Sequence, residues 1–62
     1  MVSEADLHLM RSLWVMADYS HKGAMARIEE YNPQQRQNIM EAQAVLTKAL
    51  EMIDRLEKKT TN

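Results

Sequence analysis

Two histidines, His8 and His21, are candidates for a chemical role in this chain. Glu4 and His8 stand four residues apart, so on a helix they share one face and offer two metal ligands. We prefer a solvated pair, because two histidines without any cysteine are too few for a structural metal site. His21 falls within an apolar stripe and is interpreted as a buried or boundary histidine; a pH-sensitive interface is the alternative.

A second group of residues suggests nucleic-acid binding. Tyr19 offers an aromatic ring for base stacking, and Arg11 and Lys22 lie close enough along a helix to contact phosphates. Asp18 and Glu29 interrupt this face with negative charge, which disfavours RNA. RNA binding through Arg11, Tyr19 and Lys22 is therefore kept as an alternative function.

No residues are spaced as a catalytic site requires. The chain has no nucleophile beside a base and no glycine-rich phosphate loop. Its single glycine, Gly23, falls inside a helical pattern, where we interpret it as permitting a close helix crossing. The sequence therefore predicts a protein that is not an enzyme, with no cofactor and no small-molecule substrate.

Composition narrows the class further. The chain has 62 residues, 45% of them hydrophobic, a net charge of -1 and no cysteine. A domain this small usually gains stability from disulfides, metals or oligomerisation, and here only oligomerisation is left. The near-neutral charge disfavours sequence-indifferent DNA binding. No apolar run approaches the roughly 20 residues of a membrane span, and the acidic N-terminal residues do not resemble a signal peptide, so we expect no membrane partner and a cytoplasmic location.

The positions of helix caps predict where the elements begin and end. Ser3 is a good N-cap, and Asp6 has the spacing of a capping box with it. Because Pro33 excludes the α conformation for the preceding residue, the first helix should run over about 4–31 and end near Tyr31.

The second helix has its own start signal. Asn32 is a strong N-cap, Pro33 suits the first helical position, and Gln35 completes a capping box. We expect one domain, 1–62, made of a helix over about 4–31, a turn at 32–33, a helix over about 33–58 and a frayed tail at 60–62.

Apolar residues recur at spacings of three and four along both helices, and a short connection makes the helices antiparallel. The fold class predicted is an all-α, antiparallel two-helix hairpin. Folding at Asn32 sets Trp14 near Ile53, Ala17 near Ala49 and His21 near Leu46. The candidates for core or dimer contacts are Trp14, Ala17, Leu46, Ala49 and Ile53.

Each helix also carries more apolar residues than a two-helix contact needs. Leaving that surface in water forfeits several kcal/mol at ~25 cal/mol per Å2, so we expect a homodimer that forms a four-helix bundle. Glu29 and Glu30 are expected at the end of the first helix, where the helix dipole disfavours negative charge, so they mark a further candidate surface. The partner-binding candidates are Leu9, Leu13, Met16, Tyr19, Glu29 and Glu30.

In length, two-helix layout, central bend and alternating small and large core layers, the chain resembles the Rop-type RNA-binding four-helix dimers of plasmids. The resemblance covers most of the chain as architecture, with no residue-by-residue motif. The leading expectation is a small regulatory or adaptor protein that binds another protein through its helical surfaces. The alternatives are an RNA-binding bundle, which the resemblance implies, and a structural oligomerisation module.

Overall fold

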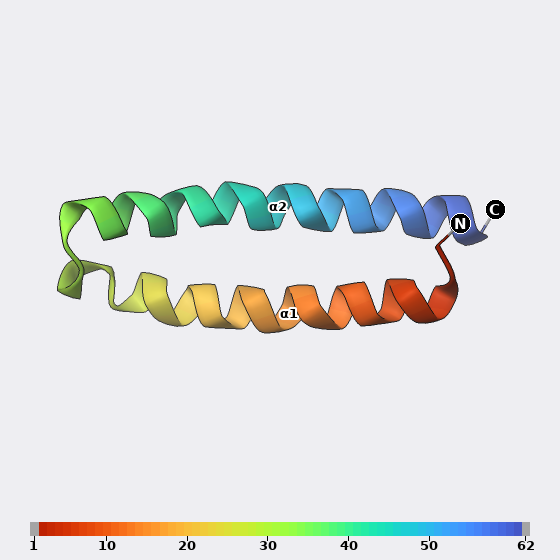
Figure 1. Cartoon of the computed structure of the whole chain (residues 1–62), viewed down its shortest axis with the longest axis horizontal. Helices are drawn as coiled ribbons and strands as arrows, with labels where there is room; N and C mark the ends of the chain where they lie inside the picture. Colours follow the sequence, from red (N-terminus) through yellow and green to blue (C-terminus); the bar gives the residue numbers. More distant parts are fainter. Residues whose placement is uncertain (1, 62) are drawn as a thin grey trace.

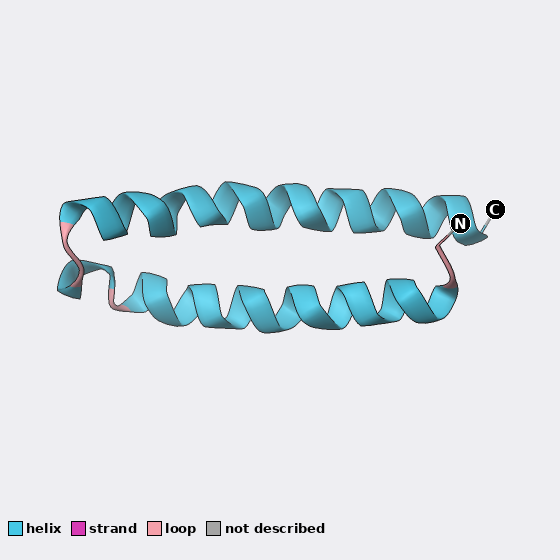
Figure 2. Cartoon of the chain, in the orientation of Figure 1, coloured by secondary structure: helices cyan, strands magenta, loops and turns pink. Residues whose placement is uncertain are grey.

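Two antiparallel helices joined by a short connection make up the chain (Figure 1). The computed structural model describes residues 2–61, over which α1 spans Glu4–Ala26, η1 spans Ile28–Glu30 and α2 spans Pro33–Thr61. Within this described part there is no strand (Figure 2). The hairpin is a rod with extents of 45 × 15 × 14 Å. The prediction of an all-α, two-helix hairpin is confirmed.

Both helix starts carry the caps that the sequence predicts. The amide of Asp6 donates to Ser3 Oγ at 3.1 Å, and the amide of Ser3 donates to Asp6 Oδ2 at 3.4 Å. The amide of Gln35 donates to Asn32 Oδ1 at 2.8 Å, and the amide of Asn32 donates to Gln35 Oε1 at 3.1 Å. Each capping box satisfies amides that have no partner within the helix, and so it sets the first residue of that helix.

The first helix ends earlier than predicted, at Ala26 instead of near Tyr31. Arg27 leaves the helical conformation and its amide bonds to the carbonyl of Ala24, after which Ile28–Glu30 form a 3-10 turn. Continuing the α-helix would place two glutamates in its last turn, where the dipole opposes negative charge. No basic residue stands in the last turn of α1 to offset them.

The second helix runs past the predicted boundary. Thr60 and Thr61 belong to α2, so the frayed tail expected at 60–62 is wrong for these two residues, and Asn62 lies outside the described residues. Thr60 Oγ1 donates to the carbonyl of Leu56 at 2.9 Å. Lys58 and Lys59 in the last turn complement the negative end of the helix dipole.

The core between the helices is small. Among residues 2–60, only Leu7, His21 and Ile53 are buried. Of the predicted core candidates, Trp14, Leu46 and Ala49 are half-buried and Ile53 is buried, but Ala17 is exposed and takes no part in the core of this hairpin. Asp18, and not Ala17, lies on the side of α1 that faces α2, one turn after Trp14. A core of this size leaves most apolar side chains in contact with water.

The pairing of the two helices differs from the predicted register by one heptad. Trp14 bonds to Leu46 and not to the region of Ile53, while His21 bonds to Ile39 and not to Leu46. The early end of α1 explains the difference, because residues 27–32 become the connection and no longer lengthen the helix. A shift of seven residues nearly preserves the helical face, so the faces were predicted correctly although the register was wrong.

Candidate functional site

Two ring nitrogens of α1 bond to the main chain of α2. Trp14 Nε1 donates to the carbonyl oxygen of Leu46 at 2.7 Å, and His21 Nε2 lies 2.7 Å from the carbonyl oxygen of Ile39. A carbonyl oxygen has no hydrogen to give, so Nε2 of His21 holds the proton in this contact. The two bonds satisfy polar atoms that the helix contact removes from water. Trp14 and His21 therefore stabilise the hairpin itself, and a pH-sensitive interface at His21 stays a prediction.

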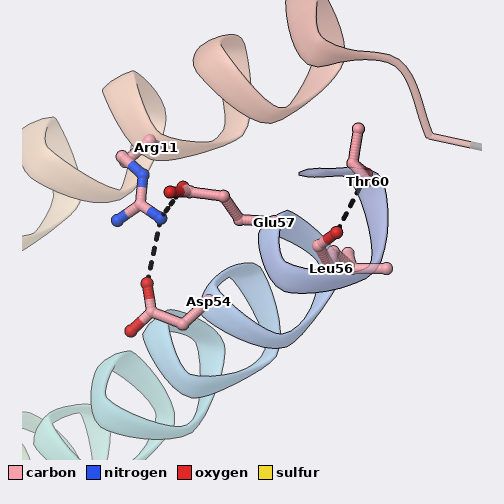
Figure 3. Close-up of polar contacts among 5 residues, drawn as sticks. All are labelled: Arg11, Asp54, Leu56, Glu57 and Thr60. Carbon is pink, nitrogen blue, oxygen red and sulfur yellow. Dashed lines mark hydrogen bonds and ion pairs between the residues drawn. The ribbon is translucent and has the colours of Figure 1, made fainter. Parts of the chain in front are cut away.

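Arg11 reaches from α1 to two carboxylates of α2 (Figure 3). Its Nη2 donates to Asp54 Oδ1 at 2.9 Å and to the carboxylate of Glu57. The hydrogen bond to Asp54, followed by the bond to Glu57, raises the pKa of Arg11 above its ordinary value. All three side chains are well exposed, so water screens the attraction. These contacts define one long side of the hairpin, named here the ion-pair side.

Three apolar residues of α1 lie away from this side. Successive residues of an α-helix are rotated by about 100°, so Leu9, Leu13 and Met16 lie about 140–200° around α1 from Arg11. Each of the three is more than half exposed. They therefore share the side of α1 opposite to the ion pair.

The same geometry places two apolar residues of α2. Val45 and Met52 lie about 180° and 160° around α2 from Asp54. Since Asp54 and Arg11 mark the same side of the hairpin, both helices direct apolar residues to the opposite side. This apolar face consists of Leu9, Leu13, Met16, Val45 and Met52, which are 55 to 68% exposed.

Small uncharged residues extend the apolar face. Ala17, Ser20 and Ala24 lie on the same side of α1, so this helix presents no charge there between Leu9 and Ala24. A contiguous exposed apolar patch of this kind marks an interaction surface. The apolar face is therefore the leading candidate site.

A second, smaller apolar patch lies on the ion-pair side. Val15 and Tyr19 are within about 80° of Arg11 around α1, and Met40 is within about 40° of Asp54 around α2. The register set by the ring-to-carbonyl bonds brings Tyr19 level with Met40. Tyr19 is 81% exposed, and Val15 and Met40 are also exposed. These three residues are named the Tyr19 surface.

The cations proposed for RNA binding are already paired with carboxylates. Arg11 contacts Asp54 and Glu57, and Lys22 Nζ lies 3.0 Å from Asp18 Oδ2. A phosphate would have to compete with these carboxylates for the same donors. Tyr19 and Lys22 are both exposed, and Lys22 is held by the carboxylate of Asp18.

The partner-binding candidates do not form one site. Leu9, Leu13 and Met16 lie on the apolar face, whereas Tyr19 lies about 60–120° around α1 from them, toward the ion-pair side. The remaining two, Glu29 and Glu30, are exposed in η1 at the turn. Arg27 Nε lies 4.0 Å from Glu30 Oε2 and offsets part of the charge at this end.

A shallow hollow lies at the open end of the hairpin and includes the pair first considered for metal binding. It has a volume of about 250 Å3 and is lined by Glu4, Leu7, His8, Arg11, Glu57 and Thr60. Across the part of the chain that the structure describes, no group of three or more histidine, cysteine or acidic side chains could hold a metal ion.

The sequence did not predict two features of the site. Asp18 was placed on the face considered for RNA, but its side chain is only 17% exposed and lies toward α2. The contacts of Arg11 with Asp54 and Glu57 were also not predicted, because they depend on the register. The periodicity of each helix, combined with the correct connection length, would have revealed both.

Comparisons with known proteins give no relative: no family model, curated protein or solved structure matches this chain. Over the described residues, neither helix has an apolar stretch of the length that a membrane crossing requires.

Proposed function

We propose that this chain is a small, non-enzymatic regulatory or adaptor protein that works as a homodimer and binds another protein. In this proposal the apolar face joins two hairpins into a four-helix bundle, and the Tyr19 surface remains for the partner protein. The observation that carries the proposal is the presence of two exposed apolar surfaces on different sides of one thin hairpin.

The surface area of the hairpin supports self-association. The chain exposes 5120 Å2, whereas a compact folded monomer of its 7.2 kDa mass exposes about 4,100 Å2. The excess of about 1,000 Å2 is similar to the roughly 800 Å2 that each partner buries in a standard interface. Among residues 2–60 only two apolar side chains, Leu7 and Ile53, are buried, so a single hairpin also lacks the core that independent stability requires.

The Tyr19 surface supports a protein partner. An exposed tyrosine flanked by aliphatic side chains is typical of interface hot spots, because its ring adds a large contact area at little entropic cost. Since the surface lies along straight helices, the partner that fits it is an amphipathic helix that packs its apolar side chains beside Tyr19. The carboxylates already paired with Arg11 and Lys22 make RNA the weaker candidate.

Site-specific photocrosslinking in the native host would test the partner assignment. We expect p-benzoylphenylalanine at position 19 to form discrete protein adducts that resist ribonuclease. The same photoreactive residue at Glu51, an exposed position of α2 eleven residues from Met40 and about 100–120° around the helix from Met52 and Val45, serves as the matched control. Adducts that disappear with ribonuclease would make the protein an RNA binder, and adducts shared equally with position 51 would remove the Tyr19 surface as a specific site.

Sedimentation velocity at micromolar concentration would test the homodimer. We expect a dimer for the native chain and a loss of self-association for Leu13→Glu, which puts a charge on the apolar face. Gln43→Glu adds the same charge on the ion-pair side, about 160° around α2 from Val45, and should leave the dimer intact. A native chain that stays monomeric, with a melting temperature independent of concentration, would contradict the proposal.

A cytoplasmic location stays a prediction from the sequence.

A further inference from the structure

We propose that the apolar face is covered by a second copy of this chain, turned so that the two connections lie at opposite ends of the bundle. The two-fold axis of this dimer runs perpendicular to the helices, and α1 packs on α1 and α2 on α2. This inference rests on the homodimer proposed above and adds its arrangement, which the area argument alone leaves open.

The spacing of apolar residues along α1 supports such an axis. Leu9 and Met16 lie at equal distances on either side of a level between Ser12 and Leu13. A two-fold axis at that level sets Leu9 of one copy against Met16 of the other. Leu13, next to the axis, then meets its own counterpart, as an isologous interface requires.

The spacing along α2 places the axis at the same height. Val45 and Met52 are symmetric about a level between Lys48 and Ala49. The bonds from Trp14 to Leu46 and from His21 to Ile39 set this level within about one residue, or roughly 1.5 Å, of the level found on α1. One axis therefore pairs Val45 with Met52 and Leu9 with Met16 at the same time.

Charges at the edge of the apolar face distinguish this arrangement from its alternative. Glu41 and Arg55 lie on the outer edge of α2, about 40° beyond Val45 and 60° beyond Met52 in the same rotational sense. Neither makes an ion pair among the residues described in the hairpin, where Glu41 accepts only the amide of Gln37. Around the proposed axis, Glu41 of each copy faces Arg55 of the other.

A dimer with both connections at the same end fits these edges poorly. In that arrangement α2 packs on α1 of the other copy, and its charged edge lies beside Leu9 and Met16. The opposite-end arrangement instead joins apolar residues to apolar residues and Glu41 to Arg55. Electrostatic complementarity of this kind selects orientation more than it adds affinity.

Spin labels would measure the arrangement, and the absence of native cysteine makes each label unique. Gln34→Cys places a label at the exposed start of α2, next to the connection. In the proposed dimer the two labels are separated by a distance comparable with the 45 Å length of the rod. A separation no larger than the width of the bundle would overturn the arrangement. Gln34 lies eleven residues from Val45 along α2, beyond the apolar residues of the proposed interface, and its replacement removes the exposed bond from Gln34 Nε2 to Asn38 Oδ1.

Charge reversal gives an independent test. We expect Glu41→Arg to weaken the dimer several-fold, and the double change Glu41→Arg with Arg55→Glu to restore it to within about twofold of the native value. Glu51→Arg, on an exposed part of α2 away from the apolar face, is the matched control and should have no such effect. Failure of the double change to restore association would contradict the Glu41–Arg55 contact and with it the proposed axis.

The two proposals fail in different ways. If sedimentation shows no dimer of the native chain, self-association and its arrangement both fall. If a dimer forms but the Gln34 labels lie close together, the homodimer stands and the opposite-end arrangement falls. Oxidative crosslinking of Leu13→Cys adds a direct check, because the two cysteines lie beside the axis; an intact dimer of this variant that does not crosslink would also count against the arrangement.

Discussion

Trp14 Nε1 and the carbonyl oxygen of Leu46 are 2.7 Å apart, although 32 residues separate them in the sequence. This bond, with that of His21 to Ile39, holds one helix to the backbone of the other. Small side chains such as Ala42 and Ala49 lie on the same face of α2 as these carbonyls and leave room for the rings. These two bonds therefore add to a small apolar core in the contact between the helices.

Trp14→Phe should destabilise the hairpin. The change removes the only donor of this side chain and part of its buried ring, which together contribute about 1–2 kcal/mol. Thermal melting followed by circular dichroism would show a lower midpoint. Tyr19→Phe, at an exposed ring of the same helix, should change stability by less than about 0.5 kcal/mol. Equal effects of the two changes would mean that the Trp14 bond contributes nothing.

Asn32→Ala should weaken the start of α2. The substitution removes the side-chain oxygen that accepts the amide of Gln35, a cap that contributes about 1 kcal/mol. The melting midpoint should fall while total helicity changes little. Asn38→Ala, an exposed position inside the same helix, should not lower the midpoint, since alanine is the better helix former. An unchanged midpoint for Asn32→Ala would show that the cap is not needed.

Arg11→Gln should lower stability slightly at low salt, and the difference should shrink as salt screens the exposed ion pair. The carboxylates raise the pKa of Arg11. A basic group with a raised pKa stabilises the fold at every pH below its unfolded pKa, and the effect is lost only as the pH rises through the folded pKa. For arginine this window is strongly alkaline, so the difference between native and variant melting temperatures should stay constant from about pH 7 to pH 9. A difference that disappears over that range would contradict this assignment.

Gly23→Ala should stabilise the hairpin by about 0.5–1 kcal/mol, because glycine costs entropy inside a helix. A Cβ at this position meets no atom within 4 Å in the single hairpin, so the close crossing predicted from the sequence does not occur here. Gly23→Ser should give a smaller gain, as serine is a poorer helix former than alanine. Chemical unfolding would measure both, and a loss of stability for alanine would reveal a neighbouring chain packed against this glycine.

Local signals in the sequence predicted local structure well. Ser3 and Asn32 begin the helices where their capping boxes indicated, because a cap depends on residues only three positions apart. The end of α1 was missed, since proline at position 33 marks where a helix cannot continue and not where it has already stopped. The unfavourable position of Glu29 and Glu30 against the helix dipole accounts for the earlier end.

The arrangement between helices was harder to predict for a related reason. Heptad stripes fit together nearly equally well after a shift of seven residues, so periodicity alone could not separate Ile53 from Leu46 as the neighbour of Trp14. The actual register follows from the length of the connection. The contacts of Arg11 with Asp54 and Glu57 depend on that register, and so does the shared side of Leu13 and Val45.

The start of α1 and the end of α2 lie together at one end of the rod, with the connection at the other end (Figure 1). Anything fused to either end of the chain therefore leaves the hairpin from the same pole. In the proposed bundle the second copy points the other way, so two fused domains would project from opposite poles. The bundle would then act as a rigid spacer that holds the two fused domains apart by about its own length.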